Sequence, residues 1–407
     1  MNLIFVDIPS FRDTLKPFTF TRPVSTIRVG IVTLGEKWQM RLDQDIPTSH
    51  ITDSYLAEKY PLRVEADNLV VNPAVAADNE LVDELTKLEP RSALYQGEVL
   101  VGACIPGEDL TVLAGYPSPL DQLPEVLAKC RSINYDRPLV IIQHPWDIFL
   151  QNGEQIQADY NWLTRNRTSS AISDIHTRTY GEKNIFVEEG VAIKAAIINA
   201  ESGPVYLGKN TTIHENAVIK GPFAMLEGAH VNIGAKIREA TTIGPNSKVG
   251  GEVKNSVFQA NSNKGHEGFV GNSVIGEWCN FGADTNTSNL KNNYQPIKLW
   301  DYRIRQLEDS GQTFCGLMMG DHSKCGINTM FNTGTVVGVF TNLFGGGFLP
   351  KFIPSFSWGG SDSLVEFRFE KAVEVLERVL ARRNQTPNLL DLEILKHISQ
   401  YRSSEFS

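Results

Sequence analysis

Residues 207–249 read LGKNTTIHENAVIKGPFAMLEGAHVNIGAKIREATTIGPNSKV, and an aliphatic residue or methionine returns at every sixth position of this stretch. These positions are Leu207, Ile213, Ile219, Met225, Val231, Ile237, Ile243 and Val249. The residue four places after each of them, up to Ser247, is small with the exception of Phe223. A period of six differs from the 3.6-residue period of an α-helix and from the alternation of an ordinary strand. The pattern predicts a left-handed parallel β-helix of hexapeptide repeats, in which three hexads form one triangular coil.

The repeat continues on both sides of this stretch, with a change of register at each junction. Hydrophobic residues in steps of six or twelve precede it at Val187 and Ile193 and follow it in two further blocks. These blocks contain Val257, Phe269, Ile275 and Phe281, and then Met319, Cys325, Phe331, Val337 and Leu343. We therefore expect the β-helix to cover residues 185–347, with a loop over residues 286–312. Loops of this length are uncommon in compact domains and often carry function.

The sequence before the β-helix has a different pattern of apolar residues. Short apolar runs, which predict buried strands, alternate with stretches that predict helices. The expected strands cover residues 3–5, 68–71 and 139–142, and the expected helices cover residues 27–42, 79–88 and 123–129. This alternation predicts a Rossmann-like α/β domain over residues 1–165 with a mainly parallel sheet. A linker over residues 166–184 joins it to the β-helix.

The last part of the chain is expected to be helical. Apolar residues recur near helical spacing from Leu364 to Leu380, which predicts a helical tail over residues 361–404. Its simplest role is to cap the open end of the β-helix, because repeat folds need such caps.

Composition and charge narrow the classes of function. The net charge of −9 argues against nucleic acid or an anionic membrane as the main partner. The opening residues MNLIFVDIPS lack the basic segment of a signal peptide, and no apolar run is long enough to cross a bilayer. The five cysteines are scattered and form no C-x-x-C pair, which indicates reduced thiols and no metal site. We expect a cytoplasmic protein that acts on small molecules.

One hexad breaks the pattern and is the best candidate for chemistry. Residues 263–268 read NKGHEG, and the count of six places Asn263 where the other hexads have an apolar core residue. His266 then falls at an outward position between two glycines. An exposed histidine suits a general base that works near neutral pH. Spacing alone leaves open the alternative of a surface histidine in a tight turn.

The residues around this hexad resemble a known family. Residues 254–276 read KNSVFQANSNKGHEGFVGNSVIG, with a lysine twelve positions before the histidine, and residues 279–285 read CNFGADT. The segment resembles the acetyltransferase half of the bifunctional sugar-1-phosphate nucleotidylyltransferase/acetyltransferases, which include the N-acetylglucosamine-1-phosphate uridylyltransferases. In that family the same lysine and histidine are followed by Y-V-G-D-S and N-x-G-A-G-T.

The resemblance implies roles for four residues of the β-helix. His266 matches the general base that deprotonates the amine of a hexosamine 1-phosphate, so that the amine attacks acetyl-CoA. Lys254 and Asn289 match residues that bind the sugar phosphate, and Ala283 matches a position that lines the acetyl-CoA site. The resemblance also implies a homotrimer with its sites between neighbouring subunits.

Three positions depart from the family pattern. Met225 stands in place of the arginine of P-F-A-R, and Phe269 stands in place of the tyrosine after the histidine. Asp284 replaces the last glycine of G-A-G-T. The loss of an arginine and a hydroxyl near the phosphate bears on the identity of the acceptor and leaves the base unchanged.

The first domain resembles sugar-1-phosphate nucleotidylyltransferases, including a divergent group of them, through residues 7–23, DIPSFRDTLKPFTFTRP. In that family a glycine-rich loop and basic side chains hold the triphosphate of the nucleotide. The frame L-x-P-x-T is kept here, and the resemblance implies that Arg12, Lys16 and Arg22 bind the nucleotide. The loop glycines are missing. The resemblance implies Mg²⁺ as a cofactor, although Asn72 stands where the family has the aspartate that binds it.

Together these patterns predict a transferase of nucleotide-sugar metabolism. Its β-helix is expected to acetylate a hexosamine 1-phosphate with acetyl-CoA, and its nucleotidyltransferase-like first domain to act on a sugar 1-phosphate and a nucleoside triphosphate. Two alternatives stay open: a nucleotidyltransferase alone, for example of the glucose-1-phosphate type, and a non-catalytic regulatory or scaffold protein. A metal hydrase of the γ-carbonic anhydrase type is set aside, because the histidines of the β-helix fall at unlike positions of the repeat.

Overall fold

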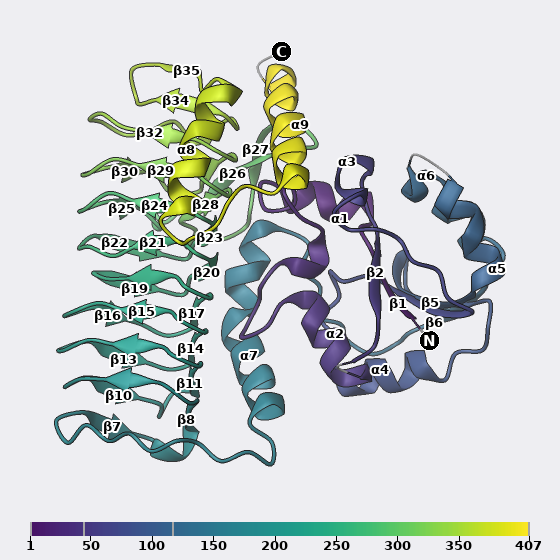
Figure 1. Cartoon of the computed structure of the whole chain (residues 1–407), viewed down its shortest axis with the longest axis horizontal. Helices are drawn as coiled ribbons and strands as arrows, with labels where there is room; N and C mark the ends of the chain where they lie inside the picture. Colours follow the sequence, from purple (N-terminus) through teal and green to yellow (C-terminus); the bar gives the residue numbers. More distant parts are fainter. Residues whose placement is uncertain (1, 44, 116–117, 406–407) are drawn as a thin grey trace.

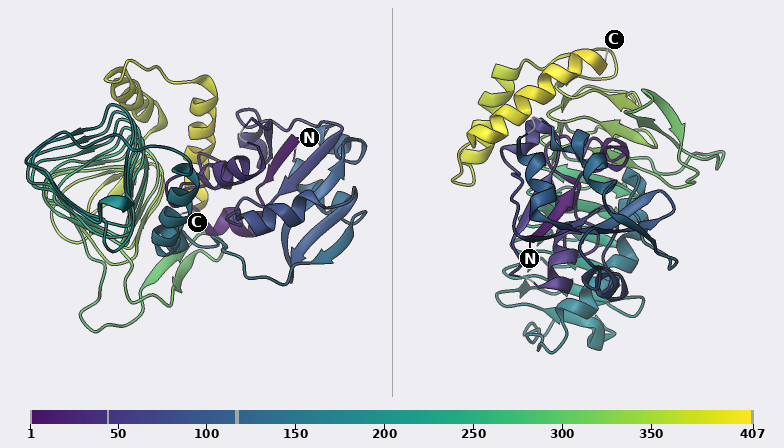
Figure 2. Two further views of the ribbon diagram at one scale, coloured as in Figure 1. Left: turned by 90° about the horizontal axis from the view of Figure 1, so that it is seen from below. Right: turned by 90° about the vertical axis from the view of Figure 1, so that its right-hand side faces the viewer.

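The computed structural model describes residues 2–43, 45–115 and 118–405 (Figure 1). An α/β domain lies beside a parallel β-helix, and two C-terminal helices lie over the last coils of the β-helix and reach the first domain. Seen along its axis, the β-helix has a three-sided outline (Figure 2). Within the described ranges, no helix is long and apolar enough to cross a membrane.

The first domain is built on a mixed sheet. In spatial order its strands are β2 (Thr48–Ile51), β1 (Asn2–Val6), β3 (Asp67–Val71), β5 (Val99–Pro106), β4 (Ser92–Gln96) and β6 (Arg131–Asn134). β1 is parallel to β2 and β3, and β4 is parallel to β6, whereas β5 is antiparallel to both of its neighbours. The expected strand over residues 139–142 is wrong, because that segment makes only an isolated bridge from Ile141 to Val75.

The helices of the first domain are mostly short. They are α1 (Pro9–Thr14), α2 (Leu34–Leu42), α3 (Ser54–Ala57), α4 (Asn79–Thr86), α5 (Gly107–Leu110), α6 (Pro119–Leu127) and α7 (Pro145–Leu163). The helix expected over residues 27–42 begins only at Leu34, because Thr33 and Glu36 form a capping box there. The long helix α7 was not predicted, and it contacts one face of the β-helix through β14, β17, β20 and β23.

The β-helix has three faces of parallel strands. The open face contains β7 (Arg178–Tyr180), β10 (Ile197–Asn199), β13 (Val218–Lys220), β16 (Lys236–Ile237), β19 (Glu252–Lys254) and β22 (Phe269–Gly271). The face toward α7 contains β8 (Ile185–Val187), β11 (Val205–Leu207), β14 (Phe223–Met225), β17 (Thr241–Ile243), β20 (Val257–Ala260), β23 (Val274–Glu277), β28 (Leu317–Met319), β31 (Thr335–Val337) and β33 (Phe352–Ile353). The third face contains β9 (Ala192–Ile193), β12 (Thr212–Ile213), β15 (His230–Val231), β18 (Lys248–Val249), β21 (Asn263–Lys264), β24 (Asn280–Phe281), β29 (Lys324–Cys325), β32 (Asn342–Leu343), β34 (Ser357–Gly359) and the antiparallel β35 (Leu364–Glu366).

The β-helix extends beyond the predicted range of 185–347. Its first strand starts at Arg178 inside the expected linker, and β34 ends at Gly359. Inside the expected loop over residues 286–312, β25 (Asn286–Thr287) pairs with β30 (Met330–Phe331) and continues the coils. Only then does the chain leave the β-helix, to form an antiparallel hairpin of β26 (Lys298–Asp301) and β27 (Gln306–Asp309).

The interior of the β-helix corrects the predicted register after Val249. The inward-facing residues that follow it are Val253, Phe258, Lys264, Val270, Ile275 and Phe281. Val249 and Val253 are four residues apart and Phe258 follows after five, so a fixed count of six goes out of phase. Val257 and Phe269 therefore do not point inward. Asn263, expected in the core, pairs with Lys248 on the outside, and the core position is taken by Lys264.

One corner of the β-helix has a left-handed backbone residue in each of several successive coils, joined by hydrogen bonds from coil to coil. In chain order these residues are Gly228, Asn246, Asn261, Trp278, His322, Phe340 and Phe356. We call the last four the aromatic ladder, because they stack with ring centroids 5.2–6.5 Å apart. Glycine and asparagine adopt this backbone conformation readily, whereas large aromatic residues adopt it at a cost.

The tail helices pack against the aromatic ladder. They are α8 (Phe369–Ala381) and α9 (Leu389–Glu405). Phe367, just before α8, meets the ring of Phe340 edge-on at 5.9 Å. Apolar residues of both helices share one buried cluster with the ladder: Leu376, Leu380, Ile394, Leu395 and Ile398. The tail thus covers a side corner near the end of the β-helix and continues to the first domain (Figure 1).

Candidate active site

His266 lies on an exposed turn between β21 and β22. The turn is stacked between the corresponding turns of the two neighbouring coils. On one side lies Gly250, which is so close that a Cβ on it would meet the Gly265 carbonyl oxygen at 2.4 Å. On the other side, the backbone N–H of Asp284 donates to the Glu267 carbonyl at 3.1 Å. Ala283, the residue before Asp284, therefore lies one coil from His266 at the same corner.

The two other candidates lie on the adjoining open face, near its end at β22. Lys254 ends β19 and is paired in register with Gly271 of the next coil. No side chain fits at Gly271, because a Cβ there would lie 2.5 Å from the Phe269 ring and 2.9 Å from the Asn289 side-chain nitrogen. Phe269 and Asn289 therefore pack directly against Gly271, the residue with which Lys254 is paired.

Asn289 is held in place by a neighbour that the sequence did not single out. Its Nδ2 donates to Oδ1 of Asn272 at 2.8 Å, which leaves the side-chain oxygen Oδ1 of Asn289 as an acceptor. The Asn272 backbone N–H donates in turn to the Lys254 carbonyl at 3.0 Å. These bonds connect the predicted substrate residues across successive coils. The structure thus brings His266, Ala283, Lys254 and Asn289 to one corner and its adjoining face.

The predicted nucleotide residues of the first domain lie elsewhere. Arg12 is buried and donates to Tyr55 Oη at 2.6 Å, and its guanidinium lies 3.3 Å from Asp53 and 3.7 Å from Asp7. Burial raises the pKa of Asp7 to about 6 despite the nearby guanidinium. Lys16 pairs with Asp13 at 2.9 Å. Arg12 and Lys16 line one small pocket of about 60 Å³.

The tail helix α9 forms one wall of this small pocket. The His397 ring stacks on Tyr55 with centroids 4.0 Å apart, and Lys16 Nζ lies 5.2 Å from the centre of the Tyr401 ring. The surface that the resemblance assigns to a nucleotide is therefore covered by the tail of the same chain.

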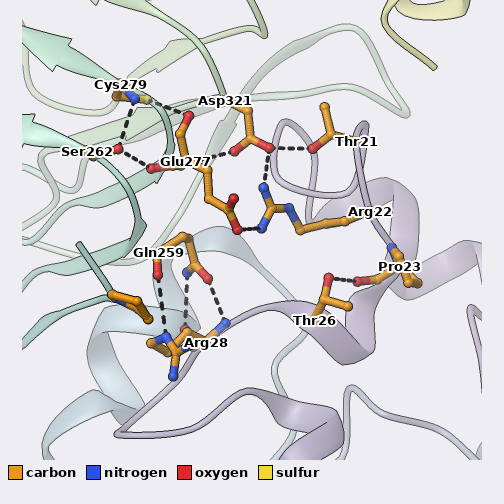
Figure 3. A network of polar contacts seen from close by, with 12 residues as sticks. Thr21, Arg22, Pro23, Thr26, Arg28, Gln259, Ser262, Glu277, Cys279 and Asp321 are labelled. Carbon is orange, nitrogen blue, oxygen red and sulfur yellow. Dashed lines mark hydrogen bonds and ion pairs between the residues drawn. The ribbon is translucent and has the colours of Figure 1, made fainter. Parts of the chain in front are cut away.

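Arg22 serves a different purpose from the other two cations. It forms ion pairs with Glu277 and Asp321 of the β-helix, and Asp321 also accepts from Thr21 (Figure 3). Gln259 adds to this joint, because its side-chain amide bonds both the N–H and the carbonyl of Arg28. Arg22 thus fastens the first domain to the β-helix, and its charge is already balanced.

A cavity of about 370 Å³ lies beside this joint, where the first domain, the β-helix and the tail meet. Two of the three cations that line it, Arg22 and Lys59, are paired with carboxylates, whereas Arg28 donates to backbone carbonyls. Burial lowers the pKa of His322, which also lines it, to about 3, so this imidazole is neutral. The walls therefore carry three cations and the three carboxylates Glu277, Asp321 and Asp391.

Asn72 does not fit the role of a magnesium ligand. Its Oδ1 accepts from the Ala74 N–H at 3.0 Å, and its Nδ2 donates to the Leu100 carbonyl at 3.1 Å, so both ends of the amide are used by the backbone. Mg²⁺ prefers carboxylate ligands in octahedral geometry. In the part of the chain that the structure describes, no three histidine, cysteine or acidic side chains gather as metal ligands.

Comparisons with known proteins extend this picture. Residues 3–168 match the family model described as sugar nucleotidyl transferase, which covers the first domain. The putative uncharacterized acetyltransferase YaiX of Escherichia coli strain K12 is 30% identical over 186 residues, which cover 44% of this chain and 76% of YaiX. This chain belongs to the same acetyltransferase family as YaiX.

Other relatives of this chain are named as bifunctional proteins. The bifunctional protein GlmU of Methanocaldococcus jannaschii is 36% identical over 146 residues, which cover 31% of this chain and 35% of GlmU. The bifunctional sugar-1-phosphate nucleotidylyltransferase/acetyltransferase of Sulfurisphaera tokodaii is 30% identical over 154 residues, 33% of this chain and 38% of that protein. The chain therefore spans little more than a third of the length of these relatives. Among solved structures, the polySia-specific acetyltransferase NeuO covers 51% of this chain at 16% identity with a TM-score of 0.29.

Two residues at the site of this YaiX relative escaped the sequence analysis. Asn272 orients Asn289, and Lys264 lies inside the β-helix beneath the His266 turn. The only signal for Lys264 was that a lysine stood one position from the expected core residue. The shortened steps after Val249 hid its inward direction.

Proposed function

We propose that the protein transfers an acetyl group from acetyl-CoA to the amine of a hexosamine 1-phosphate. The site is the corner of the β-helix that carries His266 and Ala283, which we call the His266 corner. One observation carries this proposal. His266 is exposed on its turn, and the candidate substrate residues Lys254 and Asn289 lie on the adjoining face, where both are neighbours of Gly271. Membership in an acetyltransferase family and the bifunctional relatives support the same reaction class.

The chemistry assigns one task to each side chain. His266 accepts a proton from the amine as its nitrogen attacks the thioester carbonyl. The new C–N bond forms, the C–S bond breaks, and the leaving thiolate takes up a proton to become free CoA. The Lys254 ammonium neutralises the phosphate, and the side-chain oxygen of Asn289 accepts a hydrogen bond from a sugar hydroxyl. Ala283 lies along the acetyl-CoA path at the next coil.

The proposal includes a homotrimer. α7 covers one face of the β-helix and the tail covers one corner, whereas none of the described helices lies on the open face β7–β22 (Figure 2). Apolar side chains such as Ile197 and Val218 are exposed on it. Copies of the chain that meet on this face bring the end of β22, and with it the His266 corner, next to a neighbouring subunit.

A second candidate function concerns the first domain. Its family implies nucleotidyl transfer to a sugar 1-phosphate, with Arg12 and Lys16 as nucleotide contacts. The backbone-bound Asn72 and the cover formed by α9 favour instead a regulatory domain that binds without catalysis. Incorporation of labelled UTP into a nucleotide sugar separates the two roles.

The acetyl transfer is tested by thiol release from acetyl-CoA with glucosamine 1-phosphate as acceptor. Glucose 1-phosphate, which has no amine, is the matched control. We expect thiol release with the amino sugar and none above background with glucose 1-phosphate. Release that is absent with both glucosamine and galactosamine 1-phosphate, or equal with glucose 1-phosphate, contradicts the proposal.

A further inference from the structure

Lys264 occupies a position that a charged side chain rarely takes. It pairs in register with the core residue Val249 of the coil below, and it is 2% exposed. The neighbouring interior positions are apolar, for example Val270 and Phe281. Removing an ammonium group from water costs several kcal/mol unless it finds partners, as an order of magnitude. A lysine at this place therefore needs an explanation in its contacts.

The contacts of Lys264 all lead to the turn that carries His266. Its Nζ donates to the carbonyl oxygen of His266 and, at 3.1 Å, to that of Glu267. The turn is also held at Gly265, whose carbonyl accepts from Asn232 Nδ2 at 2.8 Å. A tether from inside the β-helix thus fixes two consecutive peptide groups on which His266 stands.

We propose that Lys264 is a positioning residue, which holds the backbone of the His266 turn from within the β-helix so that the imidazole keeps its place at the corner. The catalytic consequence rests on the proposed function, whereas the tether itself does not. In an apolar interior an ammonium donates to a carbonyl more strongly than a neutral amine does. Protonated Lys264 therefore gives the firmer turn.

The charge state of Lys264 changes in an accessible pH range. Burial lowers its pKa to about 8, while Glu267 of the turn, Asp284 of the coil above and Cys325 of the coil after that oppose this shift. Between about pH 8 and the ordinary value of 10.5 the unfolded chain binds a proton that the folded chain has lost, so global stability rises with pH there. The tether weakens over the same range.

The test compares Lys264→Met with the matched control Lys248→Met, whose side chain is exposed one residue from core Val249. Methionine fills the interior without a charge. We expect Lys264→Met to keep or raise its Tm, to exchange the amide hydrogens of residues 265–268 at least tenfold faster, and to lose kcat at least tenfold with little change in KM. Lys248→Met leaves all four quantities unchanged.

Lys264→Arg keeps a charge at every accessible pH. In this variant we expect restored protection of the turn and a kcat that does not fall above pH 8, where that of the parent protein does. Unchanged exchange in Lys264→Met overturns the tether, and so does a lowered Tm with activity lost only in proportion to unfolding. Hydrogen exchange decides the tether even if the parent protein acetylates no amino sugar, so failure of the proposed function is recognised separately.

Discussion

Two lysines of this chain are fully or almost fully buried, and their partners differ in kind. Lys37 lies 2.6 Å from both carboxylate oxygens of Asp159, in an ion pair with no exposure on either side chain. Lys264 instead donates to the backbone carbonyls of His266 and Glu267. The family resemblance assigned Lys254 and Asn289 to the same site as His266. It could not predict which lysines turn inward, since that depends on a shortened coil and on a helix distant in sequence.

The Lys37–Asp159 pair allows a sharp test at the residue scale. Asp159→Asn leaves the ammonium buried without its counter-charge, so we expect a loss of about 3–5 kcal/mol in the free energy of unfolding. The double variant Lys37→Met/Asp159→Leu removes both charges and should recover most of that loss. Urea titration of the parent protein, the single variant and the double variant measures these free energies of unfolding. A single variant as stable as the parent would show that Lys37 is solvated and not buried.

At the scale of elements, the aromatic ladder explains how the tail attaches. Four aromatic residues occupy left-handed backbone positions where earlier coils have Gly228, Asn246 and Asn261. Each costs about 1–2 kcal/mol of backbone strain, which the burial of α8 and α9 offsets. The sequence predicted the tail as helical but placed it on the open end of the β-helix. Helical spacing predicts which face of a helix is apolar, but it does not predict the surface against which that face packs.

Phe340→Asn tests the ladder. Asparagine suits the left-handed position, but it removes a ring that touches Phe356 and Phe367. We expect a net loss of about 1–4 kcal/mol, from the ~3–5 kcal/mol of a buried phenylalanine less the relieved strain. The tail helices should become cleavable by protease in residues 360–390. Phe344→Asn, at an exposed ring on a nearby coil, is the control. Equal proteolysis of the two variants would mean that the ladder does not hold the tail.

At the scale of the whole molecule, α7 and the segment after residue 27 join the first domain to the β-helix. Asp159 of α7 accepts from the Ile31 N–H at 2.9 Å, and Thr242 of the β-helix donates to the Gly30 carbonyl at 2.9 Å. Arg22 adds the ion pairs to Glu277 and Asp321. These contacts hold the first domain against the β-helix. The repeat was readable because its period is local, whereas these joints connect residues hundreds of positions apart and leave no periodic signal.

The role of His266 is tested by the kcat for acetyl transfer to glucosamine 1-phosphate in His266→Ala. The control is His214→Ala, a partly exposed histidine of the β-helix. We expect kcat to fall about 10²–10⁴-fold in His266→Ala, the usual contribution of a general base, with an unchanged KM for acetyl-CoA. We expect His214→Ala to keep the activity of the parent protein. Full activity of folded His266→Ala would contradict the assignment of this corner as the active site.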